Sequence, residues 1–346
     1  MIKWHTKSVY NLKNAYLCTQ MKLLAQLFKS DAKPIRSLLW LEWAMVVYVV
    51  LTTVLIAVTF NRLHDPLQML WGRGQALLMT LALWCSYRLF PCRLTLLGRV
   101  CGQLLFLGWW YPDTFELNRI YPNLDAFFAQ AEQSLFGFQP ALTFCREFTS
   151  PLLSELLSLG YVSYYPMIVA VVLYYFFWCY ERFLRSSFII IASFFLFYVI
   201  FIAVPVAGPQ FYYQAVGTDQ IAQGVFPWLG DYFNRLPFEV TNHEHSLPIP
   251  GWKDGFFYRM LVGAHNAGER PTAAFPSSHV GITTVVLWLA HEARSRRLLF
   301  SLLPLAVLMF FATFYIQAHY AIDAIAGLFA GTLMYFFFRR VYREGV

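Results

Sequence analysis

Repeated apolar runs constrain the fold of this chain more than any other feature of its sequence. A helix needs roughly 20 apolar residues to cross about 30 Å of hydrocarbon, and most of the runs approach that length. The runs lie at about 39–60, 74–90, 94–111, 155–178, 187–206, 277–292, 298–318 and 320–340. Pro91 divides the second run from the third, so that pair could form one tilted or re-entrant hairpin. The pattern predicts an all-α, polytopic transmembrane helical bundle of six to eight spans.

The amino-acid composition supports a bilayer environment rather than an aqueous one. Of the 346 residues, 58% are hydrophobic and 13% are charged, against roughly 25% charged residues in soluble domains. The net charge of +7 could suit nucleic acid, but the basic residues cluster beside the apolar runs, where membrane topology places them. We therefore expect no nucleic-acid partner. The sequence does not set the oligomeric state.

Short basic connectors predict the orientation of the bundle, because Lys and Arg gather on the cytoplasmic side of a membrane. The basic residues of these connectors and of the tail are Arg182, Arg185, Arg294, Arg296, Arg297, Arg339, Arg340 and Arg343. Both termini are then cytoplasmic, and the two long connectors, at about 112–154 and 207–276, lie outside. We expect an integral, multi-pass protein of a bacterial inner membrane, or of the Golgi if the source is eukaryotic.

This topology divides the chain into three regions. They are a cytoplasmic amphipathic N-terminal segment (1–38), N-terminal transmembrane helices (39–111) and a catalytic transmembrane domain (112–346). In the third region, the pattern from Leu124 to Leu135 predicts an amphipathic interfacial helix that ends at Gly137, with Asp125 and Glu132 on its solvent-exposed face. The second connector is rich in Pro, Gly, Tyr and Phe, which predicts a long extracytoplasmic loop ordered as a cap.

The first candidate catalytic motif lies where the second long connector enters an apolar run. Pro276 suits a first helical turn, and Ser277 and Ser278 offer hydroxyl groups beside unpaired backbone N–H groups, which together form an anion site. His279 could add a proton donor. The alternative interpretation is a helix N-cap followed by an interfacial histidine. Arg270, nine residues before His279, could supply a cation, although a solvated loop arginine is as reasonable.

The second motif lies about forty residues further on, at the junction of the last two apolar runs. His319 and Asp323 are four residues apart, which places both on one face of a helix. A carboxylate there could hold the imidazole in one tautomer and make its other nitrogen nucleophilic. The alternative is a pair that is hydrogen-bonded for structure alone.

Topology brings the two motifs to the same outer face, where ionisable groups are costly and usually functional. His319 could attack phosphorus, His279 could protonate the leaving oxygen, and Asp323 could stabilise the growing charge without a metal. We therefore expect no cofactor. His243, His245 and His265 share the outer loop, but their spacing fits no compact set of metal ligands, so no metal site is expected.

Both motifs resemble a known family of membrane enzymes. Pro276 to His279, and His319 to Asp323 followed by Ala326-Gly327, resemble the second and third signature motifs of the type 2 phosphatidic acid phosphatase superfamily. The resemblance extends over about residues 94–340. Other features resemble the branch that contains the inositol phosphorylceramide synthases, which is related to the sphingomyelin synthases. These features are Asp125, Glu132, residues 137–140, Tyr161, Tyr164, Tyr165, residues 205–209, Tyr212 and Ala274-Phe275.

The resemblance implies roles for three residues and a class of substrate. His319 would form a phosphohistidine, Asp323 would orient it, and His279 would act as acid and base. The chain lacks the Lys-x6-Arg-Pro motif of the phosphatases and has Thr313 where they carry Arg. This departure favours transfer of a less charged, substituted phosphate, most simply inositol phosphate from a glycerophospholipid to a ceramide-like alcohol.

Other functions stay open on the sequence. The same site could belong to a lipid phosphate or polyprenyl pyrophosphate phosphatase, with water as the acceptor. It could be the proton relay of a transporter, or a facial set of metal ligands in a membrane oxidase or hydrolase. Tyr212, like Tyr161, Tyr164 and Tyr165, could line a polyol or lipid pocket, although interfacial tyrosines more often anchor a protein in the bilayer.

Overall fold

The computed structural model describes residues 26–236, 245–268 and 270–343. Within these ranges the chain is helical and contains no β-strand, which confirms the expected all-α class. Most of the predicted N-terminal segment 1–38, including His5, lies outside the described residues, as does His243 of the outer loop.

Each of the eight apolar runs coincides with a helix or with a pair of helices. The helices of these runs are α2 (Trp40–Thr59), α3 (Pro66–Leu89), α4 (Arg93–Asn118), α7 (Pro151–Val162), α8 (Tyr164–Trp178), α9 (Phe183–Ala203), α14 (Ser278–Glu292), α15 (Arg296–Tyr315) and α16 (Ala321–Val341). Helices α7 and α8 form one run that bends by 46°. Short 3-10 turns are η1 (Phe60–Arg62), η2 (Tyr180–Arg182) and η3 (Phe233–Arg235).

Four helices of the described chain are long and apolar enough to cross a bilayer, and the bent pair α7–α8 would make a fifth span. These apolar helices indicate an integral membrane protein. The expected six to eight spans are not confirmed, because the other three helices differ from a simple span. Buried polar side chains such as Arg73 in α3 and Arg99 in α4 interrupt two of them, and α14 has only 15 residues.

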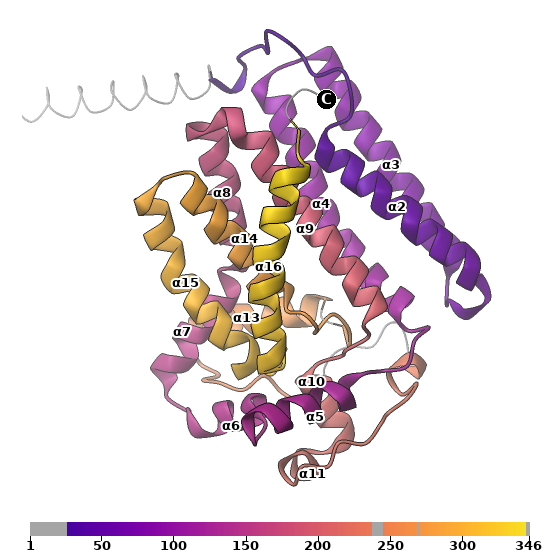
Figure 1. The fold of residues 1–346 in the computed structure, drawn as a ribbon, viewed down its shortest axis with the longest axis vertical. Coiled ribbons are helices and arrows are strands. Elements are labelled where there is room, and N and C mark those ends of the chain that lie inside the picture. The colour runs from indigo at the N-terminus through magenta and orange to yellow at the C-terminus, as the bar shows by residue number, and fades with distance from the viewer. Residues whose placement is uncertain (1–25, 237–244, 269, 344–346) are drawn as a thin grey trace, which may run out of the picture.

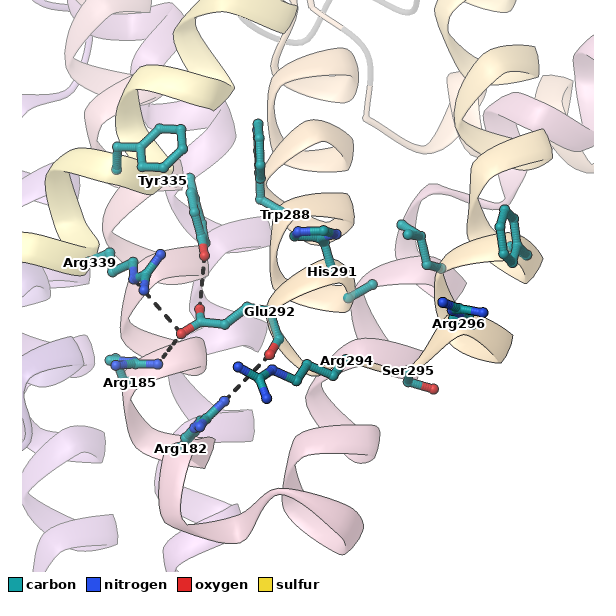
Figure 2. Close-up of a pocket in the computed structure, with 14 residues that line it drawn as sticks. Arg182, Arg185, Trp288, His291, Glu292, Arg294, Ser295, Arg296, Tyr335 and Arg339 are labelled. Carbon is teal, nitrogen blue, oxygen red and sulfur yellow. Dashed lines mark hydrogen bonds and ion pairs between the residues drawn. The ribbon is translucent and has the colours of Figure 1, made fainter.

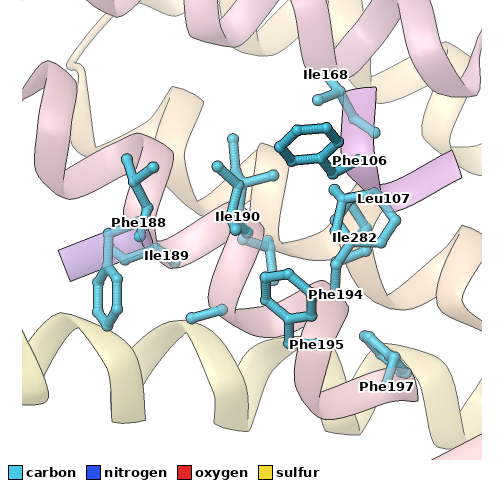
Figure 3. Packing of buried hydrophobic residues seen from close by; sticks show 14 of the residues in the cluster. Phe106, Leu107, Ile168, Phe188, Ile189, Ile190, Phe194, Phe195, Phe197 and Ile282 are labelled. Carbon is cyan, nitrogen blue, oxygen red and sulfur yellow. The ribbon is translucent and has the colours of Figure 1, made fainter. Parts of the chain in front are cut away.

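Helix α9 forms the centre of the bundle (Figure 1) and packs against α2, α4, α8, α14 and α16. Of its most apolar window, 78% is buried inside the protein, against 28% to 39% for the other three candidate spans. Figure 3 shows Ile190, Phe194 and Phe197 of this helix packed among side chains of neighbouring helices. The central position explains why α9 is apolar on all sides.

Short helices cover the end of the bundle at which α16 begins (Figure 1). They are α5 (Asp125–Phe136), α6 (Pro140–Glu147), α10 (Pro209–Val216) and α11 (Thr218–Ala222), and α13 (Phe256–Gly268) packs nearby on α7. The predicted amphipathic helix is confirmed as α5, which ends at Gly137 with φ of 78°. The expected solvent exposure of Asp125 and Glu132 was wrong, because both side chains are buried.

Glycines bring α14 and α16 into direct backbone contact. A Cβ atom added to Gly331 of α16 would collide with the carbonyl group of Gly281 in α14, and one added to Gly327 would collide with the carbonyl of Ser277. Small residues four apart allow this close approach between membrane helices. The contact fixes the start of α14 beside the start of α16, where the two histidine motifs lie.

Candidate active site

Ser277 is the N-cap of α14. Its hydroxyl accepts a hydrogen bond from Val280 N at 3.4 Å, its own N–H donates to the carbonyl of Asp323 at 3.0 Å, and the side chain is fully buried. Pro276 therefore precedes the cap instead of occupying the first helical turn. The cap leaves Ser278 and His279 as the partly exposed residues of this motif.

His279 lies between two tyrosines from the bend of α7 and α8. The ring centroids of Tyr161 and Tyr164 are each 4.5 Å from that of His279, and the Tyr161 ring is stacked on it at 27°. Tyr164 also donates to the carbonyl of Ser278 at 3.4 Å. Tyr165, by contrast, is 68% exposed. Of the three tyrosines, only Tyr165 has the exposure of a membrane anchor; the other two position the histidine.

His319 lies in the turn between α15 and α16, and its ring faces His279. Its Nδ1 is 2.7 Å from the carbonyl oxygen of Ala274, and its Nε2 is 3.4 Å from Nδ1 of His279. A carbonyl only accepts, so Nδ1 of His319 carries the proton and Nε2 keeps its lone pair. Burial lowers the pKa of His319 to about 4, which makes the imidazole neutral at neutral pH.

Asp323 caps its own helix rather than holding the imidazole of His319. Its Oδ2 accepts from the N–H of Tyr320 at 2.8 Å but lies 3.9 Å from Nδ1 of His319, too far for a hydrogen bond. The sequence pattern assumed that both residues share a helix. Helix α16 begins at Ala321, so His319 precedes it and the one-face argument does not apply. The carbonyl of Ala274 takes the orienting role, and the carboxyl group of Asp323 lies 3.9 Å from the ring nitrogen.

Asp125 of α5 holds the residue next to His319. Its carboxyl group accepts from the N–H groups of Ala207 at 2.7 Å and Gly208 at 2.8 Å, and from the hydroxyl of Tyr320 at 3.0 Å. Gly208 has φ of 96°, and a Cβ there would press on the carbonyl of Ala318. A single buried carboxyl group thus joins α5, the turn before α10 and the turn before α16.

Glu132, two helical turns further along α5, meets the first residue of α16. Its Oε1 accepts from the N–H of Ala321 at 2.6 Å. Burial raises the pKa of Glu132 to about 8. Sequence reasoning missed the positioning role of both acids because it ranked them as solvated. Their spacing of seven residues, with Ala129 between them on the same narrow face, was the available signal.

The remaining predicted site residues are Tyr212 and Arg270. Tyr212 is fully buried, and its hydroxyl donates to the carbonyl of Pro227 at 2.9 Å, as a packing residue would. Arg270 is partly buried in the segment that leads to the first motif. Among the described residues, no three His, Cys, Asp or Glu side chains are placed to share one metal ion, so this geometry does not support the facial ligand set.

Comparison with known proteins adds a family to this geometry. No curated protein and no solved structure matches the chain. A family model described as the PAP2 superfamily matches residues 126–337, which is more than half of the chain. The matched stretch starts in α5 and ends in α16, so it contains His279, His319 and Asp323, whereas α2, α3 and α4 precede it. The chain therefore belongs to the PAP2 superfamily.

Proposed function

We propose that this protein is an integral membrane lipid phosphotransferase that works through a phosphohistidine. Membership of the PAP2 superfamily suggests phosphatase or phosphotransferase activity. Our finer proposal is that it moves inositol phosphate from phosphatidylinositol to a ceramide-like alcohol. The observation that carries the phosphohistidine mechanism is the pair of facing imidazoles, in which Nε2 of His319 lies 3.4 Å from His279 while Nδ1 is held by a carbonyl.

The first half of the reaction cleaves the donor lipid. The lone pair on Nε2 of His319 attacks phosphorus, and the bond from phosphorus to the diacylglycerol oxygen breaks. His279 takes up a proton from solution when the anionic donor binds beside it, and it donates that proton to the diacylglycerol oxygen, which leaves as a neutral alcohol. The phosphorylated imidazole keeps its proton on Nδ1, where the carbonyl of Ala274 and the carboxylate of Asp323, 3.9 Å away, stabilise its positive charge.

The second half transfers the phosphoryl group to the acceptor. His279, now without its extra proton, removes the proton of the acceptor hydroxyl as the oxygen attacks phosphorus. The bond from phosphorus to Nε2 of His319 breaks, and the imidazole returns to its starting state. Tyr161 and Tyr164 hold the ring of His279 from two sides, so one histidine can serve both alcohols without changing position.

Charge at the site favours a phosphodiester donor over a phosphomonoester. Thr313, at the position of the phosphatase arginine, is fully buried and its hydroxyl donates to the carbonyl of Phe310. A dianionic monoester would therefore find no arginine at this position to balance its second charge, whereas a monoanionic diester carries only one charge to balance.

Product analysis tests the proposal directly. Purified full-length protein is incubated with headgroup-labelled phosphatidylinositol, with and without ceramide, and the lipids are separated. We expect label in a new phosphosphingolipid, with an equal amount of diacylglycerol, only when ceramide is present. Release of inorganic phosphate from a lipid phosphate, with no transfer to ceramide, would instead establish the phosphatase alternative. A His319→Ala variant should lose labelled phosphohistidine, whereas Tyr165→Phe at the exposed tyrosine should keep it.

A further inference from the structure

Figure 2 shows a cavity of about 860 Å³. It opens at the end of the bundle remote from the two histidines. Helices α14 and α16 connect the two ends. His279 stands in the first turn of α14, and Glu292, its last residue, lines the cavity. Likewise Asp323 stands in the first turn of α16, and Arg339 in its last turn lines the cavity. The cavity is therefore separate from the candidate active site.

The lining of this cavity is strongly cationic. Its charged residues come from η2, α9, the turn before α15, α15, α16 and the end of α14. They are Arg182, Arg185, Arg294, Arg296, Arg339 and Glu292. Five arginines against one glutamate leave an excess of four positive charges around a single hollow. Such an excess creates a favourable potential for an anion.

Glu292 forms ion pairs with some of the lining arginines but not with all of them. Its carboxyl group pairs with Arg185, lies 3.8 Å from Nε of Arg339 and accepts from the hydroxyl of Tyr335 at 2.9 Å. Figure 2 shows these side chains meeting at one side of the cavity. The guanidinium groups of Arg294 and Arg296 form no ion pair with any residue that the structure describes. Their charge is free to meet a ligand.

The apolar part of the lining identifies the kind of anion. Phe300 is 64% exposed and Phe336 is 41% exposed, and both line the cavity beside the arginines. Trp288, stacked on Tyr335 at 13°, also lines the cavity. Guanidinium groups bind phosphate oxygens in a fork geometry, and exposed aromatic side chains on a membrane protein contact acyl chains. A free phosphate ion would use only the first of these features.

We propose that this cavity binds the headgroup of an anionic phospholipid from the leaflet at this end of the bundle. Basic residues at a cytoplasmic membrane end are expected from topology alone. Topology does not explain why some of them converge on one cavity while their neighbours do not. Arg297 and Arg340 follow Arg296 and Arg339 directly in the sequence, yet neither lines the cavity.

These neighbours provide a matched control. The cavity variant is Arg294→Gln with Arg296→Gln, and the control variant is Arg297→Gln with Arg340→Gln. Both remove two positive charges at the same end, so a diffuse surface potential would weaken equally. Saturable binding of labelled phosphatidylglycerol to the purified full-length protein is measured in phosphatidylcholine nanodiscs. Any binding at the histidines is common to all samples and cancels in the comparison.

We expect the cavity variant to lose at least fivefold in apparent affinity for phosphatidylglycerol and the control variant less than twofold. An Arg296→Lys variant, which keeps the positive charge but not the planar guanidinium group, should give an intermediate loss of affinity. Melting temperatures should show that each variant is folded. Equal losses in the cavity and control variants, or no saturable binding in the wild type, would overturn the proposal. Displacement of the lipid by inorganic phosphate at equal concentration would show a free-anion site and overturn it as well.

Discussion

At the scale of single residues, the backbone decides which nitrogen of His319 can react. The carbonyl of Ala274 accepts from Nδ1 at 2.7 Å, and the N–H of Ala274 is itself held by the carbonyl of Val206 at 3.0 Å. A backbone acceptor does not change its charge with pH, unlike a carboxylate. The tautomer that exposes Nε2 is therefore favoured at every pH at which the imidazole is neutral.

The buried nucleophile should tolerate acid. Burial lowers the pKa of His319 from 6.5 to about 4, so the reactive neutral form persists as pH falls until that value is approached. The acidic limb of the pH–rate profile reports the protonation of His319. On this limb we expect the single-turnover rate of phosphohistidine formation to stay nearly constant from pH 7 to pH 5 and to fall towards pH 4. A decline centred near pH 6.5 would show that His319 titrates as a solvated histidine.

Replacing Asp323 by Asn separates its charge from its capping role. The amide oxygen can still accept from the N–H of Tyr320, so α16 should keep its cap and the melting temperature should change little. Asn cannot become anionic beside the cationic phosphohistidine, so kcat should fall at least tenfold, which is about 1.4 kcal/mol. Asp323→Ala, which removes both functions, should lower kcat and the melting temperature together. Unchanged kcat in Asp323→Asn would remove Asp323 from the mechanism.

At the scale of secondary structure elements, Glu132 joins α5 to α16 with a charge that depends on pH. The pKa of Glu132 is about 8 in the folded protein and near 4.5 in an unfolded chain. Between these values the folded state holds a proton that the unfolded state releases, so stability falls as pH rises. We expect the wild-type melting temperature to drop from pH 6 to pH 9, and Glu132→Gln, which cannot ionise, to drop less. Equal drops would contradict this assignment.

The contact between α14 and α16 should be intolerant of even one methyl group. In Gly331→Ala the new Cβ would collide with the carbonyl of Gly281, so the helices must separate and the two motifs with them. We expect a destabilisation of roughly 1–3 kcal/mol and a loss of activity. Gly98→Ala in α4 is the matched control, since a Cβ there meets nothing within 4 Å. A melting temperature of Gly331→Ala equal to that of Gly98→Ala would argue against close packing.

The sequence predicted the positions of the helices better than it predicted which polar side chains are buried between them. Apolar runs located the long helices, and a glycine located the end of α5, because both signals are local. Hydrophobicity ranked Asp125 and Glu132 as solvated, although each is buried against backbone N–H groups far away in the chain. Such partners are set by tertiary packing and leave no trace in a local pattern. For the same reason the sequence could not show that Ala274, rather than Asp323, orients His319.

At the scale of the whole molecule, the two polar ends of the bundle should face opposite sides of the membrane. The short basic connectors lie at the end that holds the arginine cavity, which predicts that the histidines face the non-cytoplasmic side. In a cysteine-free background, Asp254→Cys should react with an impermeant thiol reagent added outside intact cells, and Arg297→Cys should react only after the membrane is opened. Both positions are exposed. The reverse pattern would invert the proposed topology.

The short length of α14 has a consequence for the surrounding membrane. With 15 residues it rises only about 22 Å, whereas the hydrocarbon layer is about 30 Å thick. His279 and Glu292 at its two ends are therefore closer together than the two planes of lipid headgroups. Either the bilayer thins around the protein, or the reacting phosphate descends several ångströms below its neighbours, and both cost more in a thicker membrane. The acyl-chain length of the surrounding lipid would then set the turnover rate, even where every headgroup is the same.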